Sequence, residues 1–169
     1  ARKRGARYLV TAHHAEDQAE TVLFRILRGS GESGVAGIAR QRRLGPFVTL
    51  IRPCLSIARR TLRDFADQRG LEYVADAMND DPTYLRSRIR KELLPLLEER
   101  FFPDAAAALC RLAEDSAERR EFVERKAGEY LDRHASCAGG AIAVDFGPAL
   151  AEGPFFVREI VRLLWMRNG

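Results

Sequence analysis

Residues 13–31 read His-His-Ala-Glu-Asp-Gln-Ala-Glu-Thr-Val-Leu-Phe-Arg-Ile-Leu-Arg-Gly-Ser-Gly, and this stretch decides how the first part of the chain folds. After residue 15, apolar side chains recur at the three-and-four spacing of one helix face. Glu16, Asp17 and Glu20 fall in the first turns, where negative charge suits the helix dipole. Gly29 then supplies a stop. The stretch therefore predicts a helix from about residue 15 to about residue 28.

A short β-rich run, Tyr8–Ala12, precedes this helix and predicts a buried strand. His13 and His14 then lie at the carboxyl end of the strand, where open α/β sheets bind their ligands. Adjacent side chains of an extended segment point to opposite sides, so at most one of the two histidines faces a site. A lone parallel strand cannot satisfy its own backbone groups. We therefore expect residues 8–12 either to pair with another copy of the chain or not to form a strand.

The remaining sequence is mostly helical in pattern. We expect a glycine-rich loop over residues 29–45 with a short helix inside it, and a strand over residues 47–51. Four helices are predicted: one starts at Ile57 after a Ser56 cap, one at Thr83, one after an Asp104 cap, and one at about Pro154. A further strand is predicted over residues 141–146. The inward side chains are predicted to be Leu62, Phe65, Ala66, Leu85, Ile89, Leu93, Leu96, Leu109, Leu112, Phe122, Phe156, Ile160, Leu163 and Leu164.

Composition limits the class of protein. The chain has 169 residues, 46% of them hydrophobic, enough for one ordinary domain or two small ones. No apolar run is long enough to span a bilayer, and three widely spaced cysteines favour a reducing compartment, so we expect a cytoplasmic protein without a membrane partner. Residues 1–100 hold 19 Lys and Arg against 13 Asp and Glu, whereas residues 101–169 hold 9 against 11. The basic first part makes a polyanionic partner plausible.

Three motifs together resemble one family, the bacterial tRNA(Ile)-lysidine synthases. Residues 11–21 with Leu27-Arg-Gly-Ser-Gly are similar to the family's HHxxDQxET…LRGSG segment, and Ile51-Arg-Pro-Cys-Leu55 is similar to its RPLL turn. Residues 76–95 resemble the DPSNxDxxFxRNRIRxxLLP signature, although Ala77, Met78 and Ser87 depart from it. The match covers roughly residues 5–100 and is diffuse beyond. The histidine motif alone also suits other ATP-pyrophosphatases, whereas the arginine signature in series with it is far more specific.

The resemblance implies a mainly α chain: the rear part of an α/β ATP-pyrophosphatase domain over 1–53, followed by a helical tRNA-recognition domain over 54–169. Such enzymes use ATP to adenylate the wobble cytidine of tRNA(Ile), after which lysine displaces AMP. The family's SGGxDS phosphate loop is expected upstream of residue 1, so we expect this chain to be a piece of a longer protein. Without that cradle for pyrophosphate, we expect the chain alone to be inactive.

Asp17 and Glu20 are the first candidates for catalysis. Two carboxylates beside a strand end could hold magnesium, with Asp17 the first ligand, or accept the ammonium of the substrate lysine. The alternative is a pair of acids that only balances the helix dipole. One of His13 and His14 could hydrogen-bond a phosphate or the developing charge on the base.

The arginine motif supplies the candidates for RNA. Arg86 and Arg90, four residues apart, share one helix face, whereas Arg88 points roughly the opposite way. One arginine could therefore reach the adenylation site while another meets tRNA phosphate; the alternative is a solvated face of ion pairs. The further substrate candidates are Arg28, Arg52 and, as a residue that shapes the turn before the arginines, Asn79.

Other interpretations stay open from the sequence. A freestanding helical RNA-binding module could retain these motifs without catalysis, and a tRNA thiolase would share the histidine motif. The thiolase interpretation predicts CxxC pairs, which this sequence lacks. The sequence leaves the oligomeric state open, a homodimer included.

Overall fold

The computed structural model describes residues 5–73 and 83–168. These residues form two compact units: the described residues up to Ala117 make the first, and those from Glu118 onwards make the second. Residues 54–117 thus belong to the same compact unit as residues 5–53. The functional boundary after residue 53 stays a prediction. Among the described residues, no helix is long and apolar enough to cross a membrane.

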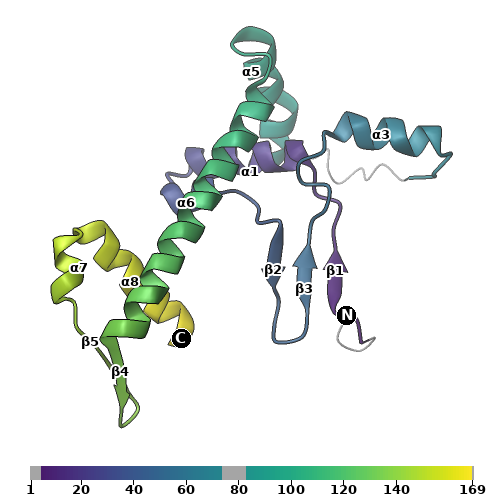
Figure 1. Ribbon diagram of the computed structural model, residues 1–169. Coiled ribbons are helices and arrows are strands. Elements are labelled where there is room, and N and C mark those ends of the chain that lie inside the picture. Colours follow the sequence, from purple (N-terminus) through teal and green to yellow (C-terminus); the bar gives the residue numbers. More distant parts are fainter. Residues whose placement is uncertain (1–4, 74–82, 169) are drawn as a thin grey trace. The chain divides into compact units, whose positions relative to one another are not determined.

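A three-stranded sheet lies at the base of the first unit, and its strands run side by side in Figure 1. The central strand β3 (Thr49–Ile51) pairs in parallel with β1 (Tyr8–Val10) and antiparallel with β2 (Gln41–Arg43). The expectation for residues 8–12 was wrong, because β1 pairs within its own chain. Leu50 is buried, whereas all three residues of β1 are exposed.

Helix α1 (Ala15–Leu27) follows β1 and carries most of the histidine motif. The Asp17 carboxylate reaches back to accept a hydrogen bond from the backbone N–H of His14 at 3.0 Å, which caps the first turn. Ala19 and Val22 are fully buried, as the helical spacing predicts. Gly29 adopts a φ of 70° just after the helix, a conformation that favours glycine, and so ends it where the sequence predicts.

Six further helical segments complete the first unit, and the last of them continues into the second. They are α2 (Glu32–Val35), α3 (Arg59–Gln68), α4 (Leu85–Arg88), η3 (Ile89–Leu93), α5 (Leu94–Arg100) and α6 (Ala105–His134). α2 is the short helix expected inside the glycine-rich loop. Helix α3 begins later than expected. Its first N–H, on Arg59, is bound by the carboxylate of Glu16, not by Ser56.

Segment η3 is a π-helical turn that joins α4 and α5 into one continuous helical stretch. The N–H of Leu94 donates to the carbonyl of Ile89, five residues earlier. In a regular α-helix the ring of Pro95 would clash with the carbonyl of Lys91. The wider turn just before Pro95 avoids this conflict, so the expected kink takes the form of a π-turn. Such turns are frequent at functional sites.

The second unit contains the last turns of α6, a hairpin and two helices. The hairpin consists of β4 (Ala135–Ala138) and β5 (Ala141–Val144), and the helices are α7 (Gly147–Ala151) and α8 (Pro154–Asn168). The core is apolar and consists of Ala127, Tyr130, Leu131, Ala149 and Ile160. The Tyr130 hydroxyl donates to the carbonyl of Asp145 at 2.5 Å and accepts the N–H of Ala149 at 3.2 Å, which ties α6 to the chain after the hairpin.

Several apolar side chains expected to be buried are exposed. Phe65 and Phe122 are both 53% exposed, and Leu85, Leu96 and Leu112 are exposed as well, so these predictions were wrong. No residue of α3 is buried, so Phe65 has no packed face to join. In α6 the buried residues are others, among them Ala113, Ala127 and Leu131. By contrast, Phe156, Ile160, Leu163 and Leu164 of α8 pack inward as predicted.

Candidate functional site

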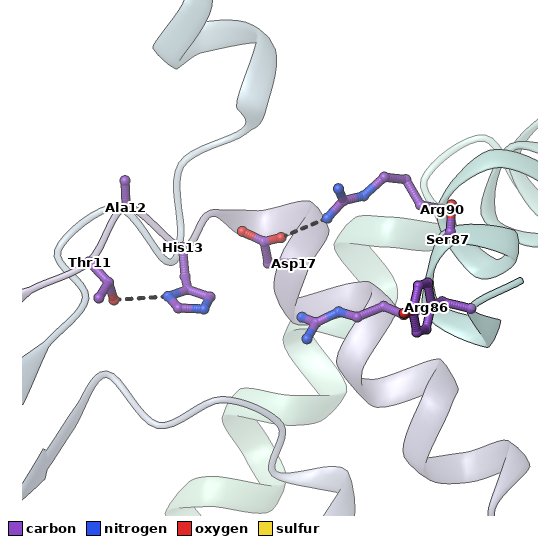
Figure 2. Close-up of a pocket in the computed structure, with 8 residues that line it drawn as sticks. Thr11, Ala12, His13, Asp17, Arg86, Ser87 and Arg90 are labelled. Atoms are coloured by element: carbon purple, nitrogen blue, oxygen red, sulfur yellow. Dashed lines mark hydrogen bonds and ion pairs between the residues drawn. The ribbon is translucent and has the colours of Figure 1, made fainter. Parts of the chain in front are cut away.

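The first unit contains a cleft of about 530 Å³ at the carboxyl end of β1. Its lining residues are Thr11, Ala12, His13, Asp17, Tyr84, Arg86, Ser87 and Arg90. Figure 2 shows the Arg86 and Arg90 side chains reaching from their helix towards Asp17 and His13. The cleft thus joins the two motifs, more than sixty residues apart in the chain.

Glu20 lies beneath the cleft and is almost completely buried, with 1% of its side chain exposed. Its carboxylate is held by both prongs of the Arg90 guanidinium: Nε donates to Oε1 at 2.6 Å and Nη2 to Oε2 at 2.9 Å. The Nε of Arg86 lies 3.5 Å from Oε2 of the same carboxylate. Two-pronged pairing of this kind adds geometric specificity as well as energy. Glu20 therefore orients the arginines and does not itself line the cleft.

Asp17 lies one helix turn earlier and does line the cleft. Its Oδ1 accepts a hydrogen bond from Nη2 of Arg90 at 3.1 Å, and its Oδ2 accepts the N–H of His14. A carboxylate has about four acceptor positions, so Asp17 can still accept a donor from a ligand in the cleft. With Arg86 and Arg90, the two acids form a balanced set of two negative and two positive charges.

Magnesium at Asp17 stays a prediction. Oδ1 of Asp17 accepts a hydrogen bond from Nη2 of Arg90 and Oδ2 accepts one from the N–H of His14, which leaves the carboxylate further acceptor positions. In the part of the chain that the structure describes, no three His, Cys, Asp or Glu side chains cluster as metal ligands. Mg²⁺ usually keeps several waters and is bound by one or two carboxylates together with substrate phosphates.

The two histidines point in different directions, as the extended backbone predicts. His13 lines the cleft, and Oγ1 of Thr11 lies 2.9 Å from its Nδ1 (Figure 2). Burial lowers the pKa of His13; Asp17 raises it, and Arg52, Arg86 and His14 lower it further. His14 instead precedes α1, and its Nδ1 lies 3.0 Å from the Glu16 carboxylate. His13 is thus the neutral histidine of the cleft.

Three of the other predicted substrate residues, Arg28, Arg52 and Arg88, do not line the cleft. Arg28 is exposed at the end of α1, with its guanidinium 5.3 Å from the centre of the Phe24 ring. Arg52 donates to the carbonyl of Ala39 at 2.7 Å, and burial, followed by Arg42, lowers its pKa. Arg88 is exposed and pairs with Glu92 at 3.7 Å, on the side predicted. Asn79 lies outside the described residues.

Four lining residues were missed by the sequence reasoning: Thr11, Ala12, Tyr84 and Ser87. Thr11 is the last polar residue before His13, and its position at a strand end was the available signal. Tyr84 lies two residues before Arg86, within the arginine signature, and is largely exposed at the cleft. Ser87 lies between Arg86 and Arg88, where it departs from the family signature, so the signature itself gave no reason to select it.

Two side chains of α1, Gln18 and Arg25, hold the glycine-rich loop against this helix. The Gln18 amide donates to the carbonyl of Ile38 and accepts its N–H, at 3.2 and 2.6 Å. Nη1 of Arg25 donates to the carbonyls of Gly34 and Gly37, each at 2.7 Å. Gln18 is buried, so its side chain is part of the framework and not of the cleft.

Comparisons with known proteins agree with the motifs. Residues 1–97 match the family model described as a PP-loop domain. The chain is 35% identical to the tRNA(Ile)-lysidine synthase of Chlamydia muridarum over 93% of this chain and 48% of the relative. It is 43% identical to that of Alkalilimnicola ehrlichii, over 95% and 35%, and 38% identical to that of Leifsonia xyli, over 97% and 48%. The chain thus spans less than half the length of each of these relatives. Neither a freestanding RNA-binding module nor a thiolase is favoured by these matches.

Proposed function

The chain belongs to the PP-loop domain family of ATP-binding proteins, and from that premise we propose that it is part of a tRNA(Ile)-lysidine synthase. The proposed reaction is an ATP-dependent ligation of lysine to the wobble cytidine of tRNA(Ile), through an adenylated intermediate, with AMP and pyrophosphate released. The proposed partners are therefore tRNA(Ile), ATP and lysine. A cytoplasmic location follows from these substrates.

One observation carries the proposal: the cleft brings Asp17 of the histidine motif together with Arg86 and Arg90 of the arginine motif. A ligation at a nucleobase needs positive charge beside the adenylate and negative charge beside the attacking amine. Arg86 and Arg90 supply the first, and Asp17, whose Oδ1 lies 3.1 Å from Nη2 of Arg90, supplies the second. Preorganised charges of this kind stabilise a transition state because they need no rearrangement during the reaction.

Each residue then has a separate role. We assign to Asp17 the binding of the ammonium of lysine, because it lines the cleft and retains acceptor capacity. Glu20 is a positioning residue that fixes Arg90. His13 donates a hydrogen bond to the adenylate, whereas Arg88, on the exposed face, contacts tRNA phosphate. Magnesium, where the reaction requires it, would be held mainly by the nucleotide phosphates and water, with Asp17 as the candidate protein ligand.

The test of catalysis uses the complete gene product that contains these 169 residues, with release of AMP as the readout. AMP release should require both lysine and tRNA(Ile) transcript. Asp17→Asn should reduce kcat/KM for lysine by about a hundredfold, because a charged hydrogen bond is lost in a partly enclosed site. Arg125→Ala, at an exposed ion pair in the second unit, is the matched control and should retain activity. Lysine-independent turnover of ATP with tRNA would contradict the proposal.

The RNA contact has its own test. Replacing Arg86, Arg88 and Arg90 together with alanine should weaken tRNA binding and flatten its dependence on salt. The reason is that fewer counterions are released from the tRNA on binding when fewer phosphates are contacted. Since Arg86 and Arg90 also hold Glu20, Arg88→Ala alone separates binding from folding. An unchanged affinity and salt slope for Arg88→Ala would show that Arg88 serves only its ion pair with Glu92. Sedimentation of the same proteins decides whether a homodimer forms.

A further inference from the structure

Thr11 lies at the rim of the cleft, where β1 gives way to α1. Its backbone N–H donates to the carbonyl of Ile51 at 3.1 Å, so residue 11 is anchored to β3. Its hydroxyl oxygen lies 2.9 Å from Nδ1 of His13. Figure 2 shows the opposite edge of the imidazole turned towards the end of the Arg86 side chain. The hydroxyl therefore connects the sheet to the one histidine that lines the cleft.

The direction of this hydrogen bond determines what His13 offers to a ligand. Among the described residues, Nδ1 of His13 is the hydrogen-bond partner of the Thr11 hydroxyl, which can donate or accept. When the hydroxyl donates, Nδ1 is the acceptor. A neutral imidazole that accepts at Nδ1 carries its proton on Nε2 and is a donor there.

The surroundings keep this imidazole neutral. Burial is the largest influence and lowers the pKa of His13 below its ordinary value of 6.5. Arg52, Arg86 and His14 lower it further, and Asp17 alone among the charged neighbours raises it. A neutral ring exists in two tautomers, so the partner at Nδ1 decides between a donor and an acceptor at Nε2. An imidazolium would donate at both nitrogens and would not need Thr11 for this purpose.

We propose that Thr11 is a positioning residue that fixes His13 as the Nε2–H tautomer, so that Nε2 and the Arg86 guanidinium together bind one anionic oxygen in the cleft. In the proposed reaction this oxygen belongs to the phosphate of the adenylated cytidine, so the proposal rests on the proposed function. Two donors that converge on one oxygen stabilise the charge that develops as AMP departs. The Asp17 carboxylate is instead paired with Arg90, with Oδ1 3.1 Å from Nη2 (Figure 2).

The tautomer is measured directly by ¹⁵N NMR of the imidazoles, without any reaction. The chain has three histidines, so His14→Gln and His134→Gln assign the His13 signals. In the parent protein near pH 8, Nδ1 should show the shift of an unprotonated nitrogen and Nε2 that of a protonated one. Thr11→Val keeps the shape of the side chain and removes the hydroxyl, and should move both shifts towards a mixture. Thr11→Ser should restore the parental pattern. Unchanged shifts in Thr11→Val, or a Thr11→Ser spectrum like that of Thr11→Val, would overturn the proposal.

Kinetics of the complete gene product test the consequence. Thr11→Val should lower kcat/KM about tenfold, the value of one net hydrogen bond, and Thr11→Ser should stay within about threefold of the parent. In the background of His13→Ala, Thr11→Val should cause no further loss, because Thr11 acts through His13. Additive losses would contradict this. If the parent protein shows no lysine- and tRNA-dependent AMP release, the proposed function fails, whereas the NMR result still decides the tautomer.

Discussion

Different interactions stabilise the interior of each of the two compact units. In the first, a buried carboxylate, Glu20, is bound by Arg90 and Arg86, so the contact between α1 and the α4–η3 segment depends on charge. In the second, α6 and α8 meet over an apolar core, and their ion pairs, such as that between Arg162 and Glu124, lie at the surface. Charges buried beneath a cleft are expensive to desolvate. Among the described residues, such charges are buried beneath the cleft of the first unit and not in the apolar core of the second, which supports the proposal that the ligand binds in the first unit.

The largest expected effect on this difference between the units comes from removing Arg90. Arg90→Ala leaves the carboxylate of Glu20 buried without its two-pronged partner. We expect a loss of about 4 kcal/mol in the free energy of unfolding, as is typical when one partner of a buried ion pair is removed. Urea denaturation followed by circular dichroism measures the loss, and hydrogen exchange should locate it in α1 and η3.

Arg162→Ala is the matched control in the second unit. Arg162 also contacts two carboxylates, Glu159 at 2.7 Å and Glu124 at 2.9 Å, but these are partly solvated. Its removal should cost less than about 1 kcal/mol. Equal losses for the two arginines would remove the distinction between the units.

A truncation in the apolar core tests what stabilises the second unit. Ile160→Ala should lower the free energy of unfolding by about 3 kcal/mol, because Ile160 is fully buried and its deletion leaves a cavity. The exchange of amides in α8 should accelerate, while that of α1 should not change. Protection lost equally in α1 would show that one cooperative core serves the whole chain.

A smaller effect is expected at Tyr130. Tyr130→Phe keeps the ring in the core but removes the hydroxyl that bonds the carbonyl of Asp145 and the N–H of Ala149. The loss in the free energy of unfolding should be about 1 kcal/mol. It should be larger if water does not reach the carbonyl of Asp145 and the N–H of Ala149 once the hydroxyl is gone. A thermal melt compared with Ile160→Ala measures it. A loss as large as that of Ile160→Ala would mean that the second unit depends on polar contacts after all.

The smallest expected effect concerns pH and the first unit. Burial tends to raise the pKa of Glu16, but hydrogen bonds from the His14 side chain and from the N–H of Arg59 outweigh burial and hold the pKa below 4.5. The folded state thus binds this proton more weakly than the unfolded state does. The stabilisation is complete above about pH 4.5 and is lost as the pH falls through the lower folded pKa. Glu16→Gln should therefore reduce the difference in urea midpoint between about pH 6 and about pH 3. An undiminished difference would contradict the role of Glu16 at the start of α3.

Local features were accessible from the sequence because they depend on spacing. The position of Asp17 in the first turn, the burial of Ala19 and Val22, and the shared face of Arg86 and Arg90 all follow from helical periodicity. The divergence of the two histidines follows from an extended backbone.

Features that depend on tertiary contacts were not accessible. Strand β2 is a short, exposed edge strand of Gln and Arg, so it carries no hydrophobic pattern and becomes visible only through its partner β3. The cap of α3 comes from Glu16, 43 residues away, and local reasoning chose Ser56 instead. Likewise, no spacing rule shows that Glu20 is buried under Arg90, or that Thr11 reaches back to His13.

The π-turn at Ile89–Leu93 has a consequence for how this stretch tolerates changes in length. Such a turn accommodates one residue more than a regular turn does, so a single-codon deletion within it would still leave a continuous helix. Because the residue removed is the one that the wider turn absorbs, the helix after the deletion would keep nearly the same orientation relative to Arg86. A deletion in the regular turn before Ile89 would instead rotate everything after it by about 100° and would turn Leu94, which is buried, towards water. The π-turn is therefore the place where this stretch can lose a residue while the cleft arginine and the packing face both keep their positions.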